Sequence, residues 1–189
     1  LFLAMGRFVD SLGGLYITAE DVNITVPDLE ICKRATQYVT GLSIKDGGSG
    51  NPSPYTAYGV FLGLVEACNW KFGSSDMTGR TVAVQGVGAV GGPLVERLVE
   101  AGAKVTITDF REERVKELVD RLGVSAVDGE AIYDVDADVF APCALGAIIN
   151  DDTIERLKCK VVAGAAHNVL HEERHGQELY DRGILYAPD

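Results

Sequence analysis

Residues 81–109 read TVAVQGVGAVGGPLVERLVEAGAKVTITD, and this stretch decides the fold. An apolar run at Val82–Val84 leads straight into GVGAVG, a glycine-rich turn at residues 86–91. An amphipathic segment follows, and then a β-branched run, Val105–Thr108, which ends on Asp109. This order predicts a strand, a tight turn, a helix and a second strand that carries an acid at its tip.

Each glycine of the turn meets a physical need of a dinucleotide site. Gly86 permits the tight turn, Gly88 lets backbone approach a pyrophosphate, and Gly91 lets the helix pack closely on the strand. The helix N-terminus offers N–H groups and the positive end of its dipole to the phosphates. An acid stands 18 residues beyond Gly91, so the pattern predicts a nucleotide site and not an ordinary strand–helix–strand crossover. The predicted cofactor-binding residues of the turn are Gly86, Gly88, Ala89, Val90 and Gly91.

Asp109 discriminates between the two common dinucleotides. A carboxylate at the end of the second strand can accept hydrogen bonds from both hydroxyls of the adenosine ribose, and it repels a 2′-phosphate. We therefore predict NAD as the cofactor, in preference to NADP. Arg111 is the discordant residue, because a guanidinium there can meet a 2′-phosphate. We interpret Arg111 as a solvent-exposed residue in the first turn of the next helix, beside Glu112 and Glu113.

The alternation of strands and helices continues to the end of the chain. The expected helices are 112–122, 151–157 and 172–182, and the expected strands are 138–141, 160–163 and 184–186. Such alternation predicts a Rossmann-like, doubly wound parallel sheet with helices on both faces. Ligands of these sheets bind beyond the carboxyl ends of the strands. The Gly86 turn, Asp109, the loop at Pro142 and the loop 164–168 are therefore expected in one cleft.

Residues 1–54 differ in character and predict part of a smaller N-terminal α/β domain. The first residues indicate the amphipathic end of a helix stopped by Gly13 and Gly14. A loop at 47–54, GGSGNPSP, precedes an expected helix at 55–72. We interpret this loop and the start of the helix as a hinge between two domains, and the alternative is a plain surface loop.

Composition limits the class of protein. The 189 residues are 47% hydrophobic and 24% charged, which is ordinary for a globular protein. The net charge of −11 argues against nucleic acid or an anionic membrane surface as partner. We find no apolar run near the roughly 20 residues that span a bilayer and no signal-peptide pattern. The scattered cysteines predict reduced thiols in a cytoplasmic protein, and they are Cys32, Cys68, Cys143 and Cys159.

His167, His171 and His175 recur every four residues, the spacing of one helix face. Because His167 follows what looks like the end of a strand, the three do not share one element. We therefore predict no metal site.

Five motifs resemble the leucine/phenylalanine/valine dehydrogenase group, nearest its leucine dehydrogenases, within the superfamily that includes glutamate dehydrogenase. They are TAEDV at 18–22, GNPSP at 50–54, AVQGVG at 83–88, FAPCALG at 140–146 and YAPD at 186–189. The motifs keep their order over essentially the whole chain. The resemblance implies reversible, NAD-dependent oxidative deamination of an L-amino acid to a 2-oxo acid and ammonia, by a homo-oligomer. It also implies three parts: a substrate, catalytic and dimerisation domain that includes 1–54, a linking helix at 55–75, and an NAD-binding domain at 76–189 that lacks its C-terminal end.

The resemblance assigns roles to single residues. Asp21 matches the catalytic aspartate that carries a proton to and from the substrate nitrogen, a task that suits a desolvated carboxylate. Glu20 is its competitor by residue type, and we interpret it as a solvated charge. The matched cofactor-binding residues are Thr56 at the nicotinamide carboxamide, Ala144 and Leu145 beside the nicotinamide ribose, and Asn168 near nicotinamide and substrate.

The resemblance also points to the substrate. Ala19 matches a position of the side-chain pocket where leucine dehydrogenases carry alanine and phenylalanine dehydrogenases tend to carry glycine. The methyl group narrows the pocket, which favours a branched aliphatic substrate by about 1–3 kcal/mol at most.

Three departures from the group stand out. Its glycine-rich segment with two lysines, one for the substrate carboxylate and one catalytic, would precede Leu1, and its Asn-Ala-Gly-Gly segment would follow Asp189. We therefore interpret the chain as an internal fragment that does not turn over alone. His167 stands where the group has the first of two asparagines, and Leu15 stands where it has an arginine.

Other functions compete with this one. A non-catalytic NAD-binding sensor, a phenylalanine- or glutamate-type dehydrogenase, and an NAD-linked oxidoreductase of hydroxy acids would use the same glycine turn. Asp21 together with Thr56 and Asn168 favours the enzyme, since a sensor needs no proton shuttle.

Overall fold

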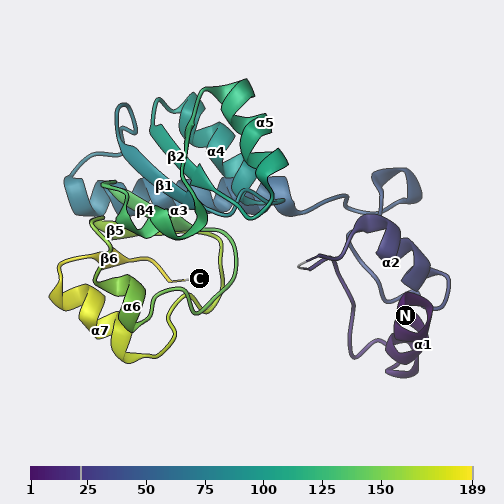
Figure 1. Ribbon diagram of the computed structural model, residues 1–189. Coiled ribbons are helices and arrows are strands. Elements are labelled where there is room, and N and C mark those ends of the chain that lie inside the picture. Colours follow the sequence, from purple (N-terminus) through teal and green to yellow (C-terminus); the bar gives the residue numbers. More distant parts are fainter. Residues whose placement is uncertain (22, 189) are drawn as a thin grey trace. The chain divides into compact units, whose positions relative to one another are not determined.

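The computed structural model describes residues 1–21 and 23–188, and it forms two compact units, Leu1–Pro52 and Ser53–Asp189 (Figure 1). Each unit has buried apolar side chains of its own. The glycine turn and both strands around it belong to the second unit.

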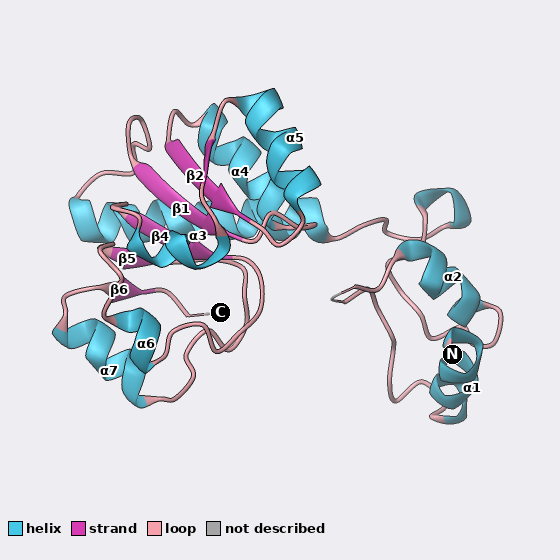
Figure 2. Cartoon of the chain, viewed as in Figure 1, coloured by secondary structure: helices cyan, strands magenta, loops and turns pink. Residues whose placement is uncertain are grey.

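The C-terminal unit is built on one six-stranded parallel sheet (Figure 2). Its strands are β1 (Thr81–Gln85), β2 (Lys104–Thr108), β3 (Ser125–Ala126), β4 (Val139–Pro142), β5 (Val161–Val162) and β6 (Leu185–Tyr186). They lie in the order β3-β2-β1-β4-β5-β6, and every neighbouring pair is parallel. This is the strand order of doubly wound nucleotide-binding folds, with the reversal of direction between β1 and β4. The predicted fold class is confirmed.

Helices cover both faces of this sheet. They are α3 (Ser53–Phe72), α4 (Gly91–Glu100), α5 (Glu112–Leu122), α6 (Asp151–Ile154), α7 (Arg174–Asp181) and the 3₁₀ helix η2 (Gly129–Asp134). Val82 and Val84 of β1 pack with α3, α4 and α5, whereas Ala83 packs with η2, α6 and α7. Alternate side chains of a strand point to opposite faces, so the three middle residues of β1 are apolar and buried on both faces of the sheet.

Two helices of this unit are shorter than predicted. α6 ends at Ile154 and not at 157, and Arg156, just beyond this end, binds Asp134, Nη2 to Oδ2 at 2.8 Å. α7 begins at Arg174 and not at 172, and just before this start the N–H of Glu172 donates to Nδ1 of His175 at 3.0 Å. Hydrophobic periodicity does not register such side-chain contacts.

The N-terminal unit contains α1 (Phe2–Ser11), α2 (Val26–Lys33), the 3₁₀ helix η1 (Ile44–Asp46) and one parallel bridge between Thr18 and Val39. A Cβ on Gly6 would lie 2.6 Å from the carbonyl oxygen of Cys32, so α1 and α2 pack in backbone contact. No helix is expected from the sequence at α2. Its start is marked by a capping box in which the N–H of Thr25 donates to Oδ2 of Asp28 at 2.9 Å.

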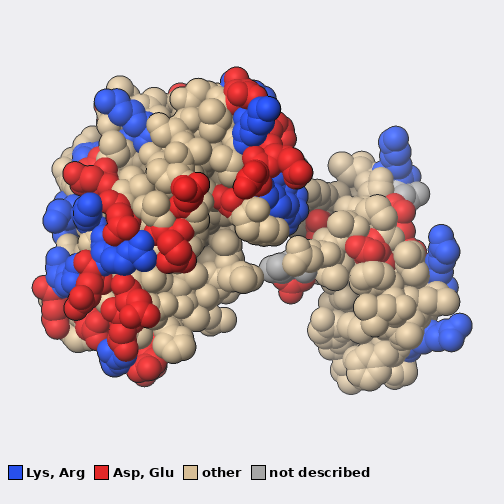
Figure 3. Space-filling model, in the orientation of Figure 1, with Lys and Arg blue, Asp and Glu red and all other residues tan. Residues whose placement is uncertain are grey.

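Charged side chains of both signs are interspersed over the C-terminal unit, densely around α6 and α7 on the face in Figure 3. Many are paired: Arg156 binds Asp134 and Glu130 at 2.8 and 3.2 Å. The hydrogen bond from Arg156 holds the pKa of Asp134 below its ordinary value. Among the described residues, no helix has the length and apolar character needed to cross a membrane.

Candidate dinucleotide site

The turn after β1 lies between the ends of the two neighbouring strands, β2 and β4. The N–H of Gly86 donates to the carbonyl of Thr108 at 2.8 Å, and its φ of 91° lies in the left-handed region. On the other side, a Cβ on Gly86 would lie 2.8 Å from Cβ of Ala144. The turn thus sits at the carboxyl ends of β2 and β4, beside the reversal of the sheet.

The three glycines of the motif have different surroundings. A Cβ on Gly91 would lie 2.0 Å from the carbonyl oxygen of Gly86, so α4 begins in contact with the end of β1. A Cβ on Gly88 would meet one side-chain atom, Nη1 of Arg114, at 3.4 Å. The first turn of α4 carries no acidic residue. An anion can therefore approach this helix end without meeting a carboxylate.

Asp109 anchors the turn to the tip of β2. Its Oδ2 accepts the N–H of Val87 at 2.8 Å, and its Oδ1 accepts the N–H of Arg111 at 2.9 Å. Each carboxylate oxygen has a second lone pair, which leaves the group able to accept ribose hydroxyls. The structure therefore adds a structural task to the predicted binding role.

Arg111 differs from its interpretation as a solvated first-turn residue. It is the N-cap of α5, its guanidinium carbon lies 4.9 Å from the ring centre of Phe110, and the residue is half-buried. Its Nε is shielded from solvent and has no hydrogen-bond partner among the residues the structure describes.

The loops after β4 and β5 are joined by backbone hydrogen bonds. The N–H groups of Ala165 and Ala166 donate to the carbonyl of Pro142 at 2.8 and 2.9 Å. The N–H of Ala147 donates to the carbonyl of Asn168 at 2.7 Å. Asn168 has a φ of 50°, an uncommon conformation that is enriched at functional sites.

The structure thus brings together most of the predicted cofactor residues. The Gly86 turn, Asp109, Ala144 and Asn168 all lie on loops at the carboxyl edge of one sheet. Ala144 and Leu145 are exposed there, as is Asn168. Thr56 is exposed in the first turn of α3, in the same unit.

Ala19 and Asp21 belong to the N-terminal unit. They follow the bridge at Thr18, and both are exposed. The carbonyl of Asp21 accepts the N–H of Ile24 at 2.9 Å. Glu20 is half-buried, with its Oε2 shielded and unpaired within the described part of the chain, so it is not the fully solvated charge that we expected.

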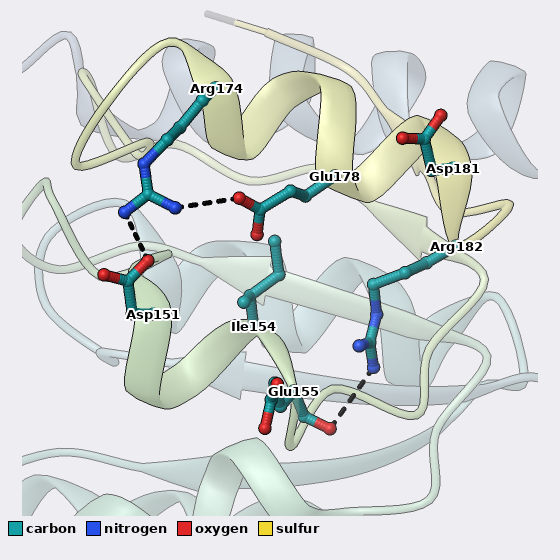
Figure 4. A pocket seen from close by; sticks show the side chains of 7 residues that line it. All are labelled: Asp151, Ile154, Glu155, Arg174, Glu178, Asp181 and Arg182. Atoms are coloured by element: carbon teal, nitrogen blue, oxygen red, sulfur yellow. Dashed lines mark hydrogen bonds and ion pairs between the residues drawn. The ribbon is translucent and has the colours of Figure 1, made fainter.

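The three histidines differ in burial. His167 and His171 are exposed, whereas His175 is buried on α7, with its Nε2 3.0 Å from Oδ1 of Asp151. Asp151, His175 and Glu178 offer ligand atoms within 4.8 Å of one another. However, the guanidinium of Arg174 bridges both carboxylates, as Figure 4 shows, so a cation already occupies this position.

Two surface hollows lie away from the predicted cofactor residues. The hollow in Figure 4, about 460 Å³, is lined by α6 and α7. A second, about 290 Å³, lies before and beside the start of β1 and is lined by Ser74, Asp76, Thr78, Gly79, Arg80 and Asp138. The predicted site is therefore described by the geometry of its loops.

The cysteines are free thiols. Burial raises the pKa of the Cys143 thiol to about 12 and those of Cys68 and Cys159 to about 11. Cys143 borders the glycine turn, but it stays protonated near neutral pH and is a poor nucleophile.

We expect Asp109→Ala to weaken NADH binding about tenfold or more, because the ribose loses its acceptor and the N–H of Val87 loses its partner. The affinity for NADPH should fall less, since the carboxylate that repels its 2′-phosphate is removed. Fluorescence titrations with NADH and with NADPH measure the two dissociation constants. Asp120→Ala, at an exposed position on α5, is the matched control. Equal affinities of the Asp109 variant and the wild type for NADH would refute the assignment.

A parallel sheet in this order, with a glycine turn at its switch point and an acid at the next strand tip, defines a doubly wound α/β protein of the dinucleotide-binding type. The sequence model of the glutamate/leucine/phenylalanine/valine dehydrogenase family matches residues 47–111 and 106–189. The chain belongs to this family.

Individual relatives agree with this assignment. The whole chain is 55% identical to leucine dehydrogenase of Thermoactinomyces intermedius and 52% identical to that of Bacillus subtilis, and it covers 52% of each. The crystal structure of L-tryptophan dehydrogenase from Nostoc punctiforme superposes with a TM-score of 0.79 at 42% identity, over 100% of this chain and 54% of that one. The chain thus spans about half the length of the curated relatives it matches.

Proposed function

We propose that this chain supplies the cofactor-binding and proton-transfer parts of an NAD-dependent L-amino-acid dehydrogenase. The reaction is the reversible oxidative deamination of a branched-chain, leucine-like amino acid to its 2-oxo acid and ammonia. The observation that carries the proposal is the glycine turn held by Asp109 at the switch point of the sheet, in a chain similar along its whole length to leucine dehydrogenases.

The residues at the sheet edge suit NAD. The open approach to Gly88 and the acid-free start of α4 fit a pyrophosphate. The remaining lone pairs of Asp109 fit the ribose hydroxyls. When bound, NAD accepts a hydride from the substrate α-carbon. The loops at Ala144 and Asn168 would position the nicotinamide half, together with Thr56.

Asp21 would hold the proton at the substrate nitrogen. A carboxylate accepts that proton from the ammonium form and returns it in the reverse direction. In this proposal residues 1–54 contribute the substrate side, residues 55–75 the link and residues 76–189 the NAD side, with a hinge at 47–54. We propose a homo-oligomer, as the family resemblance implies.

The preference for a branched aliphatic substrate rests on Ala19 and on the relatives named leucine dehydrogenase. The similarity to a tryptophan dehydrogenase keeps an aromatic substrate as the main competitor. The methyl group of Ala19 would narrow the pocket, by an effect of about 1–3 kcal/mol.

The proposal is tested by NADH formation with the full-length gene product at alkaline pH. We expect leucine, isoleucine and valine to react with higher kcat/KM than phenylalanine, tryptophan or glutamate. Absorbance at the NADH band follows the reaction. A product that binds NADH but oxidises none of these amino acids would instead indicate the non-catalytic sensor.

A further inference from the structure

One cationic side chain faces the glycine turn. Arg114 is the third residue of α5, and its Nη1 lies 3.4 Å from where a Cβ on Gly88 would stand. Apart from Gly88 itself and its two neighbours in the chain, no other described residue contributes a heavy atom within 4 Å of that point. The guanidinium therefore stands over the backbone that a dinucleotide pyrophosphate approaches.

This guanidinium lacks a protein partner in the part of the chain that the structure describes. Several other arginines of the unit are ion-paired: Arg121 of the same helix binds Glu96 at 2.6 Å, and Arg80 lies 3.8 Å from Asp138. Asp109, the nearest acid of the motif, directs its two oxygens to backbone N–H groups instead. Arg114 is half-buried, and a phosphate would supply the counterion that its guanidinium lacks.

The neighbouring arginine is engaged differently. The guanidinium of Arg111 lies over the ring of Phe110. Arg111 was the residue that the sequence singled out for a 2′-phosphate, yet the structure places Arg114, and not Arg111, against Gly88.

We propose that Arg114 is a phosphate-binding residue of the dinucleotide site. Its planar fork of N–H groups suits two oxygens of one phosphate. The same chemistry is offered by the pyrophosphate of either dinucleotide and by the 2′-phosphate of NADP. The proposal rests on the proposed NAD site, and it adds a phosphate-binding side chain to it.

The test compares Arg114→Ala, Arg114→Gln and Arg114→Lys of the full chain with wild type, by titration with NADH, NADPH and adenosine. Arg121→Ala is the matched control, at an exposed and ion-paired position of the same helix. We expect the Ala and Gln variants to bind NADH about tenfold more weakly, since a charge-assisted hydrogen bond is lost. The Lys variant should recover part of the affinity. Adenosine, which has no phosphate, should bind all variants equally.

The two phosphate sources give different results. An equal loss of affinity for NADH and NADPH identifies the pyrophosphate as the group that Arg114 binds. A loss of affinity confined to NADPH identifies the 2′-phosphate. Unchanged affinities for both in variants that melt like wild type would overturn the proposal while leaving the NAD site intact. A weaker affinity for adenosine as well would show a structural role, and would also overturn it. A wild-type chain that binds none of the three ligands would overturn the proposed function itself.

Discussion

The Gly91→Ala variant is expected to lose dinucleotide binding and about 3 kcal/mol of unfolding free energy. The added methyl group would stand 2.0 Å from the carbonyl oxygen of Gly86 and 3.0 Å from its carbonyl carbon. Both are backbone atoms, and that backbone is tied to β2 through the N–H of Gly86. The clash is therefore relieved only if α4 moves away from the end of β1. This movement would open the turn that is proposed to receive the pyrophosphate.

Gly92→Ala provides a matched control one residue further along α4. A Cβ on Gly92 would lie 3.5 Å from the carbonyl oxygen of Val87, an ordinary contact. Because alanine favours helix over glycine, this variant should be as stable as wild type or more so, by up to about 1 kcal/mol. Denaturant unfolding and NADH titration separate the two variants. Similar results for both would show that α4 tolerates a side chain at Gly91 and would contradict the proposed packing.

The fold was predictable because its deciding signals are local. The apolar run, the glycines and the β-branched run of 81–109 lie within one continuous segment, so periodicity alone identifies β1, α4 and β2. The parallel direction of β1 and β2 then follows, because a strand–helix–strand unit with short connections forms a right-handed crossover between parallel strands. The end of α6 was not predictable from periodicity. Residues 155–157 lie outside the helix, and Arg156 there binds Asp134, 22 residues away along the chain.

The candidate site was predictable in its residue types and not in its contacts. The spacing from Gly91 to Asp109 indicates a ribose acceptor, but it contains no sign that Asp109 also holds the N–H of Val87. Nor does spacing show which arginine of α5 turns toward Gly88, since that depends on rotamers and on the ring of Phe110. The motifs thus identify the types of side chain in the site, whereas the contacts of these side chains depend on their directions, which only the structure shows.

The Asp21→Asn variant of the full-length gene product is expected to lower kcat by about 10²–10⁴-fold, the usual contribution of a positioned acid–base group. Asparagine keeps the size of the side chain and removes its ability to take the proton from the substrate nitrogen. NADH binding should be unchanged, because the glycine turn and Asp109 belong to the other unit. Steady-state kinetics in both directions and NADH titration measure the two effects.

Glu20→Gln is the control for Asp21→Asn, because it makes the same chemical change at the adjacent carboxylate. The shielded, unpaired Oε2 of Glu20 makes this a demanding comparison, since Asp21 is exposed and a desolvated carboxylate suits proton transfer. If Asp21 carries the proton, the Glu20 variant should keep kcat within about threefold of wild type, far from the range of a lost acid–base group. If kcat fell strongly in the Glu20→Gln variant and by less than tenfold in the Asp21→Asn variant, the catalytic role would be assigned to Glu20. The dehydrogenase proposal would then stand, and the residue matched by family resemblance would be the wrong one.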